Sequence, residues 1–355
     1  MSSLDSVESK KSEDRWSLVA REILAGSPVR TLLAVLIGFF VGAIFMVAFN
    51  QDVIDAFAYF GSRPTDALSA MAKVVADGYG ALFNGAIYNT HANDFASAIR
   101  PITETLRLSA PLIMAGLGVG LGFRVGLFNI GGVGQMAMGL LGVTWITTRV
   151  EMPPYVHIIV AIAVAVLFAA AWGGVVGFLK AKTGAQEVIV TIMLNYVAIN
   201  LFTYFLRAPE LLLEKGGAGT PKSDAPAETA MLPNLFGEQY RLHWGLVLAV
   251  AAAFAYWWLM ERSTIGYRFR MVGHNSSAAR AAGVQVERTY IWAMAASAAF
   301  IGLAAANQGL SSIGGLTPSI HANIGFDAIT VALLGGSRAG GVVAAGLLFG
   351  AFKAG

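Results

Sequence analysis

Apolar stretches without a charged residue recur along this chain, and several are long enough to cross a lipid bilayer. They cover residues 31–49, 108–123, 126–147, 156–179, 188–206, 244–260 and 289–326. Because an α-helix rises about 1.5 Å per residue, a run of about 20 apolar residues matches the hydrocarbon core of a bilayer. Only 13% of the residues are charged, against about 25% in a typical soluble domain. So few charges could not cover a soluble surface, which predicts that lipid is the solvent of this chain.

The last part of the sequence departs from a simple succession of membrane helices. The run 289–326 is too long for one span, and it is interrupted by Asn307, Gln308, Gly314, Gly315 and Pro318. The segments 324–336 and 340–352 are short and rich in glycine, which is typical of broken or re-entrant helices. We therefore predict an all-α integral membrane protein, a polytopic bundle of about eight or nine spans that includes broken or re-entrant glycine-rich helices.

The charges between the apolar runs predict the topology. A cytoplasmic N-terminus, with sides alternating at each span, places most Lys and Arg inside and most Asp and Glu outside, as the positive-inside rule requires. We expect residues 1–30 to be a cytoplasmic tail and 31–355 to be one transmembrane domain. Within that domain, 50–107 and 207–243 are expected to be external loops, and 261–288 a cytoplasmic loop.

Several kinds of chemistry find no support in the residues. The chain has no cysteine, which excludes thiolate metal sites and a cysteine nucleophile. It lacks a Gly-x-x-x-x-Gly-Lys-Ser/Thr loop for nucleotide phosphates, and its five histidines are scattered without metal-ligand spacing. We predict no catalytic residue, metal or cofactor here, while a membrane enzyme stays open as an alternative. The net charge of +3 lies in short segments between apolar runs, so we expect no nucleic acid partner.

A few polar side chains interrupt the apolar runs. Two amides lie in the glycine-rich segment 128–135, and Glu187 begins a helical face that continues through a threonine and an asparagine at four-residue spacing. The candidates for a translocation path are Asn129, Gln135, Thr191, Asn195 and Asn307. Such groups either join helices through hydrogen bonds or line a wet path, and the sequence leaves both readings open. Because the runs hold almost no charges, the path would suit an uncharged polar solute, and an ion-driven carrier is less favoured.

The loop 261–288 is predicted to carry a short helix. Asn275 or Ser276 can cap its N-terminus, the helix can continue through Ala282, and Gly283 can end it. A loop that only anchors adjoining spans would not require such a cap and stop. We therefore interpret this helix as a docking element for another protein.

At this loop the sequence resembles the permease subunits of bacterial ABC importers for branched-chain amino acids, simple sugars and nucleosides. The pattern Gly-x-x-x-Arg-x-x-Gly-x-Asn-x-x-Ala-Ala-x-x-Ala-Gly falls on Gly266, Arg270, Gly273, Asn275, Ala278, Ala279, Ala282 and Gly283. Three further segments, 124–139, 180–196 and 325–335, also match the family in order along the chain. Segments 128–138 and 187–195 look most like the nucleoside and simple-sugar branch.

The resemblance implies a function and an assembly. In the family, the eight residues of this pattern form the coupling helix that docks on an ATP-binding subunit, and that subunit binds the ATP and Mg²⁺. The chain would be a permease subunit of an ATP-driven importer for a small uncharged polar solute, nucleosides in the first place. Simple sugars, branched-chain amino acids and an ion-coupled carrier are the alternatives. A second related permease and an external solute-binding protein or lipoprotein are the implied partners, in a bacterial cell membrane.

The sequence departs from the family pattern at two points. His274 stands where an acidic residue is common in the docking loop. Relatives usually continue through one or more further spans beyond the position of Gly355, so the chain is expected to be either a shortened or a divergent member of the family.

Overall fold

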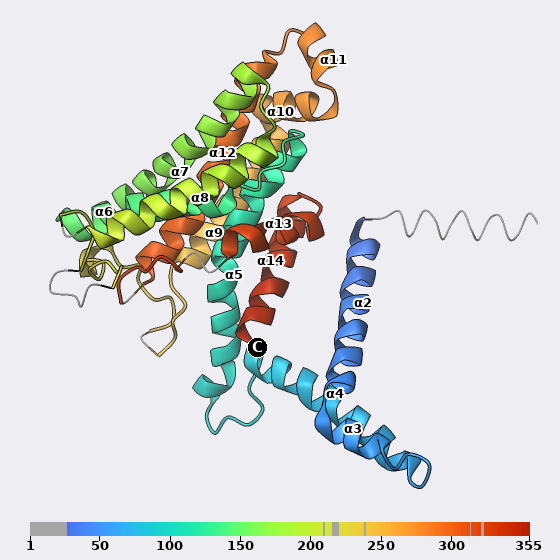
Figure 1. Cartoon of the computed structure of the whole chain (residues 1–355). Coiled ribbons are helices and arrows are strands. Elements are labelled where there is room, and N and C mark those ends of the chain that lie inside the picture. Colours follow the sequence, from blue (N-terminus) through green and yellow to red (C-terminus); the bar gives the residue numbers. More distant parts are fainter. Residues whose placement is uncertain (1–26, 209, 215–219, 238, 313, 321–322) are drawn as a thin grey trace, which may run out of the picture. The chain divides into compact units, whose positions relative to one another are not determined.

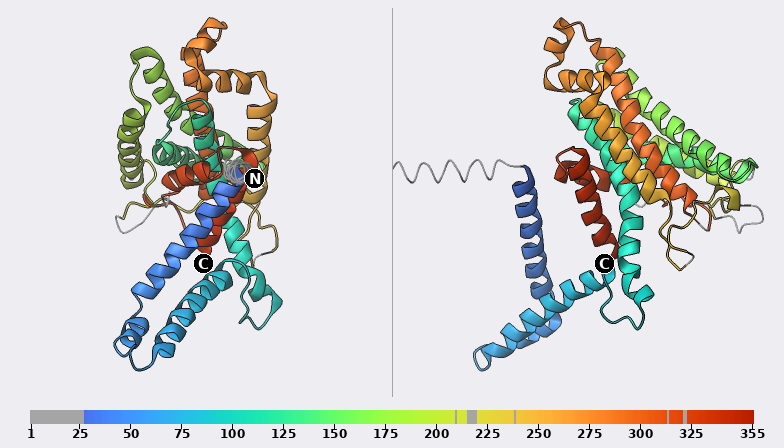
Figure 2. Two further views of the ribbon diagram at one scale, coloured as in Figure 1. Left: turned by 90° about the vertical axis from the view of Figure 1, so that its right-hand side faces the viewer. Right: turned by 180° about the vertical axis from the view of Figure 1, so that it is seen from behind.

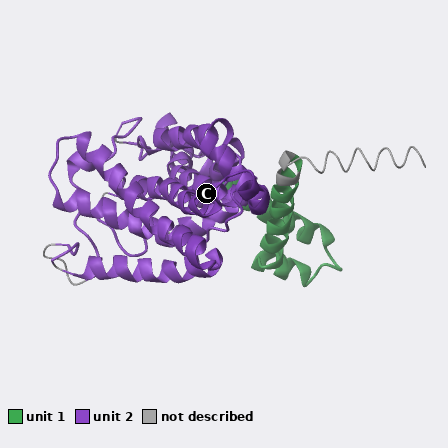
Figure 3. Ribbon diagram, turned by 90° about the horizontal axis from the view of Figure 1, so that it is seen from above, with its two compact units in different colours: residues 1–83 green, residues 84–355 purple. Residues whose placement is uncertain are grey.

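The computed structural model describes residues 27–208, 210–214, 220–237, 239–312, 314–320 and 323–355. The chain divides into two compact units, residues 1–83 and residues 84–355 (Figure 3). Most of the predicted cytoplasmic tail lies outside the described residues.

The described part of unit 1 consists of helices. They are α2 (Ser27–Ala48), α3 (Gln51–Phe57) and α4 (Pro64–Ala86), whose last residues belong to unit 2. The Asn50 side chain accepts a hydrogen bond from the Val53 N–H at 3.3 Å and so caps α3, and α3 leaves α2 at an angle of 66°. The Tyr79 hydroxyl donates to the Phe39 carbonyl, and the two rings lie 5.2 Å apart. α4 thus packs on α2 through one polar and one aromatic contact.

Unit 2 is a helical bundle in which α5 and α12 occupy the centre (Figures 1 and 2). Its helices are α5 (Phe95–Arg124), α6 (Gly132–Arg149), α7 (Val156–Thr183), α8 (Glu187–Arg207), the 3-10 turn η1 (Glu228–Ala230), α9 (Gly245–Trp257) with the π-helical turn η2 (Trp258–Arg262), α10 (Thr264–His274), α11 (Ser276–Ala281), α12 (Val286–Leu310), α13 (Ile324–Leu334) and α14 (Ala339–Ala354). Every residue of α5 from Ser109 to Gly122 is buried. α12 packs against α5, α6 and α7, so both central helices are enclosed by the others.

Small residues let the central helices approach closely. A methyl group added at Gly118 would lie 2.5 Å from the Ser297 carbonyl oxygen, and one at Gly116 would lie 2.7 Å from Val331 Cγ1. A methyl group at Gly139 would lie 2.7 Å from the Ala305 Cβ. Without a hydrophobic driving force in lipid, such contacts between backbones hold helices together.

The predicted all-α polytopic architecture is confirmed for the described residues, and every predicted apolar run contains a helix. Within the described ranges, five helices are long and apolar enough to cross a membrane, namely α5, α7, α8, α9 with η2, and α12; the bent pair α2–α3 would make six. This number is below the predicted eight or nine because α13 and α14 are too short and α6 is too polar to count as complete spans. The turn between α13 and α14 has positive φ at Gly336 and Ser337, as expected of a broken helix.

Residues 50–107, which we expect to form an external loop, are mostly helical. They contain α3, all of α4 and the first turns of α5, which begins at Phe95. The Asp94 carboxylate accepts the Ser97 N–H at 3.0 Å, caps α5 and thereby has a lowered pKa. Glu104 and Arg107, one turn apart, form an ion pair within the helix. Because these charges neutralise each other, α5 begins at Phe95, well before the predicted apolar run 108–123.

The two ends of unit 2 differ in structure. The described part of 208–244 is irregular apart from η1 and two isolated bridges, Leu213–Ser223 and Asn234–His243. α10 and α11 project from the opposite end (Figures 1 and 2). The predicted external loop 207–243 and the predicted cytoplasmic loop 261–288 therefore lie at opposite ends of the bundle.

Candidate functional site

Asn129 is the centre of a buried hydrogen-bond network at the start of α6. Its Nδ2 donates to Gln135 Oε1 at 3.0 Å and to Ser297 Oγ at 2.8 Å. Its Oδ1 accepts from Gln135 Nε2 at 3.1 Å and from the Gly131 N–H at 3.0 Å. The Ser297 hydroxyl in turn donates to the Gly118 carbonyl at 2.6 Å. The network joins the segment before α6 to both central helices.

Asn195 on α8 supports the same segment from the other side. Its Oδ1 accepts the Gly134 N–H at 2.8 Å, and its Nδ2 donates to the Ile130 carbonyl at 3.0 Å. Thr191, one turn earlier, is buried and donates to the Glu187 carbonyl at 2.7 Å. Backbone groups that leave a helix at membrane depth need partners inside the protein. These amides supply them, so the predicted network residues stabilise the irregular segment 128–131 in this conformation, and their role in a path stays a prediction.

Glu187 fastens the same segment at its surface. Its carboxylate lies 2.6 Å from Lys180 Nζ at the end of α7 and accepts the Phe128 N–H at 3.3 Å. Lys180 also lies over the Tyr290 ring, 5.5 Å from its centroid. The segment 128–131 is therefore held by α5, α8 and α12 together.

Asn307 differs from the other candidates. Its side chain is 1% exposed, and its Nδ2 has no hydrogen-bond partner among the described residues. It lies against Gly245 at the start of α9, beside His243. The His243 Nδ1 accepts the Gly245 N–H at 3.2 Å, and burial lowers the pKa of this histidine to about 4. Sequence reasoning missed His243, because only the fold brings it next to Asn307.

The docking loop has the predicted local structure. The Asn275 side chain accepts the Ala278 N–H at 3.0 Å and caps α11, and Gly283 follows the helix with a φ of 85°. Both the predicted cap and the predicted glycine stop are confirmed. Ala278 and Ala282 are exposed, whereas Ala279 is 1% exposed and faces the protein. The surface that α11 offers to a partner therefore excludes Ala279.

Backbone contacts and an ion cluster fasten the docking loop to the bundle. Arg124, at the end of α5, lies 2.5 Å from Glu261, and Arg270 lies 3.9 Å from the same carboxylate. Gly273 packs directly on the Arg124 carbonyl, and a methyl group there would lie 3.0 Å from the Val125 carbonyl carbon. Gly266 packs equally closely on the Leu259 carbonyl. Glu261, which sequence reasoning did not single out, therefore joins α5 to α10, and both glycines serve close packing.

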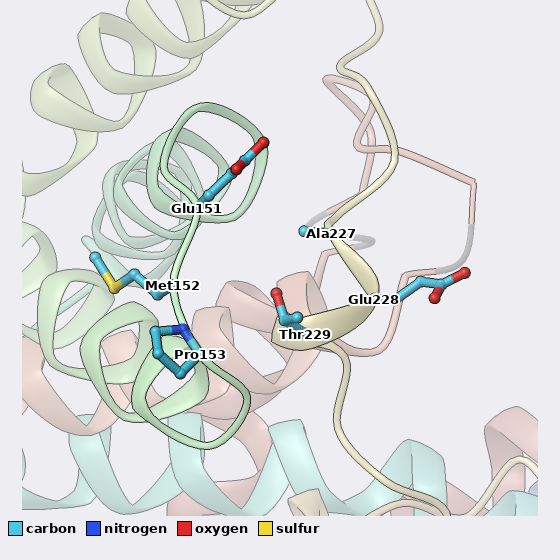
Figure 4. Close-up of a pocket in the computed structure, with 6 residues that line it drawn as sticks. All are labelled: Glu151, Met152, Pro153, Ala227, Glu228 and Thr229. Carbon is cyan, nitrogen blue, oxygen red and sulfur yellow. The ribbon is translucent and has the colours of Figure 1, made fainter.

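Two of the cavities at the surface of the described part of unit 2 are lined by none of the predicted site residues. The first, of about 580 Å³, lies between the loop after α6 and η1 and is lined by Glu151, Met152, Pro153, Ala227, Glu228 and Thr229 (Figure 4). The second, of about 420 Å³, is lined by Gly85, Asn89, Ser97, Arg100, Pro101, Thr103, Glu104 and Arg241. In Figure 4 the Glu228 side chain points away from Met152 and Pro153, so the first cavity gathers no convergent set of polar groups.

Comparison with known proteins gives one family. Residues 102–355 match the family described as the permease component of the branched-chain amino acid transport system. No solved structure matches the chain.

Three curated relatives are similar over most of their length. The guanosine ABC transporter permease protein NupP of Bacillus subtilis is 38% identical over 79% of this chain and 78% of its own. The glucose ABC transporter permease protein TsgB13 of Haloferax volcanii is 34% identical over 91% and 78%. The nucleoside ABC transporter permease protein NupB of Lactococcus lactis is 29% identical over 91% and 82%. In each organism a second permease protein named for the same solute is also similar, at 24%, 26% and 23% identity.

Proposed function

The chain belongs to the permease family of the branched-chain amino acid transport system, and from this premise we propose that it carries nucleosides across a bacterial cell membrane as part of an ATP-driven importer. Membership rests on the family match over residues 102–355 and on the relative that is 38% identical. The chain is therefore an ABC transporter permease. The solute, the partners and the residues of the path are the proposed parts.

The proposal for the solute rests on the buried residues of the described chain, none of which is charged. The buried polar residues of the described chain are Ser, Thr, Asn, Gln and His, without a carboxylate, lysine or arginine. A charged or zwitterionic solute passing between these helices would need opposite charges to replace its hydration. Amides and hydroxyls suit an uncharged polar solute, which favours a nucleoside over an amino acid.

Glucose is the second candidate, because the permease TsgB13, 34% identical, is named for it. A monosaccharide is also uncharged and polar, so the buried residues accept it on charge alone. The larger identity to the guanosine permease favours the nucleoside.

The docking loop is the proposed contact between this permease and the ATP-binding subunit that drives transport. We infer that an ATP-binding subunit, which holds ATP and Mg²⁺, contacts the exposed side of α11, including Ala278 and Ala282. Motion of α11 would pass through α10 to the end of α5, because Gly273 packs on Arg124. The segment 128–131, which contains Asn129, follows shortly after Arg124. The docking loop and the proposed translocation path are therefore connected through a short stretch of closely packed residues.

Two further partners complete the proposed importer. A second related permease would pair with this chain, since permeases named for one solute occur twice in each of three organisms with relatives. A solute-binding protein or lipoprotein would deliver the nucleoside at the end formed by 207–243. This arrangement requires a multi-pass protein with a cytoplasmic N-terminus.

Reconstitution tests the proposal. The chain, co-expressed with its neighbouring permease, ATP-binding and solute-binding proteins, is placed in proteoliposomes and supplied with labelled nucleosides, glucose or leucine. We expect uptake of nucleosides that requires ATP and is not driven by a proton or sodium gradient alone. Uptake of glucose or leucine in preference to every nucleoside would reject the proposed solute, and gradient-driven uptake without ATP would reject the proposed energy source.

A further inference from the structure

The unpartnered amide of Asn307 marks a position where a hydrogen-bond acceptor is missing. The amides of Asn129, Gln135 and Asn195 are all bonded to protein groups, whereas the Asn307 Nδ2 is buried without a partner in the described residues. A buried donor left unsatisfied is costly, so native proteins keep few of them. One that persists between membrane helices points to a ligand that supplies the acceptor.

His243 places a second donor beside the first. A methyl group at Gly245 would collide with the Asn307 amide nitrogen and would lie 2.7 Å from His243 Nδ1, so both side chains meet at this glycine. Because Nδ1 accepts the Gly245 N–H, the proton of the neutral ring is on Nε2. His243 is 5% exposed, and the hydrogen bond from the Gly245 N–H fixes its ring through Nδ1, so the Nε2–H is not used in that bond. The imidazole that carries this neutral N–H, just before α9, therefore borders the Asn307 amide near the end of α12 through its Nδ1–Cε1 edge.

We propose that Asn307 and His243 form a recognition site for an acceptor edge of the transported solute, namely the oxo and ring-nitrogen atoms of a nucleobase. This inference rests on the proposed function. Uncharged donors match uncharged acceptors, and a 6-oxopurine offers adjacent acceptors at O6 and N7, where a 6-aminopurine offers one acceptor and one donor. The site therefore prefers inosine or guanosine to adenosine.

The surrounding packing allows such a site to open. α9 packs chiefly against α5 and touches α12 little, so the start of α9 can separate from α12 without disturbing the central contacts. The Glu104–Arg107 ion pair of α5 lies near His243, in the half of the bundle next to the irregular segment 207–243. In the conformation described here the site is occluded, and Asn307 and His243 become accessible when that half opens.

Asn307→Leu tests the site through the Tm and inosine uptake. If Asn307 had only a structural role, both quantities would fall together in this variant. Leucine fills a similar space without a donor, so removal of the unsatisfied group should leave the Tm of the purified complex unchanged or raise it. In the same complex, reconstituted in proteoliposomes with ATP, inosine uptake at limiting concentration should fall at least about tenfold, and the preference for inosine over adenosine should disappear. His243→Phe, which removes the second donor, should act in the same direction.

Asn200→Leu is the matched control, because that exposed amide on α8 donates only to the Tyr196 carbonyl one turn away; inosine uptake should stay at the wild-type rate. The proposal is overturned if Asn307→Leu and His243→Phe keep wild-type inosine uptake and preference. It is also overturned if the Tm of Asn307→Leu falls in parallel with uptake, since the amide would then be structural. Failure of the wild-type complex to move any nucleoside would instead reject the proposed function.

Discussion

At the residue scale, the buried asparagines Asn195 and Asn307 differ in how their side chains are bonded. Asn195 uses both ends of its side chain to bind backbone groups of the segment before and at the start of α6. Asn307 binds none among the described residues with its Nδ2. We expect Asn195 to contribute to stability and Asn307 to recognition of the solute. Substitution of each residue can distinguish these roles.

Asn195→Ala should destabilise the protein, because it leaves the buried Gly134 N–H and Ile130 carbonyl without partners. Each orphaned group costs about 1–3 kcal/mol, although hydrogen bonds between membrane helices average only about 0.6 kcal/mol, so we expect a loss of about 1–3 kcal/mol. Thermal unfolding of the purified complex in detergent measures it. Asn200→Ala removes an exposed amide instead and should shift the Tm little; equal shifts for both variants would contradict the assigned role of Asn195.

Gly273→Ala should disrupt the contact between the docking loop and α5. The added methyl group would overlap the Arg124 carbonyl, so α10 must move away from the end of α5, and ATP hydrolysis should lose its coupling to uptake. The ratio of solute moved to ATP hydrolysed measures this. Gly174→Ala is the control, since its nearest neighbour would be the Ala295 Cβ at 3.9 Å. A normal transport ratio in Gly273→Ala would show that this contact does not transmit motion.

At the element scale, α11 presents two neighbouring alanines to different surroundings. Ala278→Glu places a charge on the exposed side, so it should block docking of the ATP-binding subunit and abolish coupled uptake with an unchanged Tm. Ala279→Glu places the charge at a position that is 1% exposed, so it should also lower the Tm, because burial of an unpaired charge is unfavourable. Co-purification of the ATP-binding subunit and the Tm of the permease distinguish the two. Normal co-purification with Ala278→Glu would remove α11 from the docking surface.

The sequence predicts those elements whose signals are local. Asn275 and Gly283 mark the two ends of α11 because a cap and a left-handed stop depend on the residues themselves. Glu261 and His243 could not be found in this way, since their contacts join residues far apart in the chain, such as the pair Arg124–Glu261. The sequence predicts a loop at the charged start of α5, because a pattern of charges does not show that Glu104 and Arg107 pair with each other.

At the scale of the whole molecule, the two ends of unit 2 have different proposed functions, namely docking of the ATP-binding subunit and recognition of the solute. The end with α10 and α11 carries a rigid docking loop joined to α5, and the opposite end carries the irregular segment 207–243 with His243 and Asn307 nearby. α5 and α12 reach both ends. The same two helices also hold the network around Asn129 through Gly118 and Ser297, so a displacement at one end reaches the other through buried, satisfied contacts.

The pH dependence of stability tests the burial of His243. Burial lowers the pKa of His243 from its usual 6.5 to about 4, so the unfolded chain binds a proton more readily than the folded one between these values. Stability is therefore full above pH 6.5 and falls as the pH drops toward 4, by up to about 3 kcal/mol at 1.36 kcal/mol per pKa unit. The lowered pKa of Asp94 acts only below its usual 3.8, outside this window.

Thermal unfolding of wild type, His243→Gln and His91→Gln at pH 7.5 and 4.5 measures the effect, because glutamine cannot take up the proton. The loss of Tm on acidification should be smaller in His243→Gln than in the wild type. The exposed His91 serves as the control, and its variant should lose as much as the wild type. If all three lose the same amount, His243 is not buried in the folded protein, and its partnership with Asn307 fails with it.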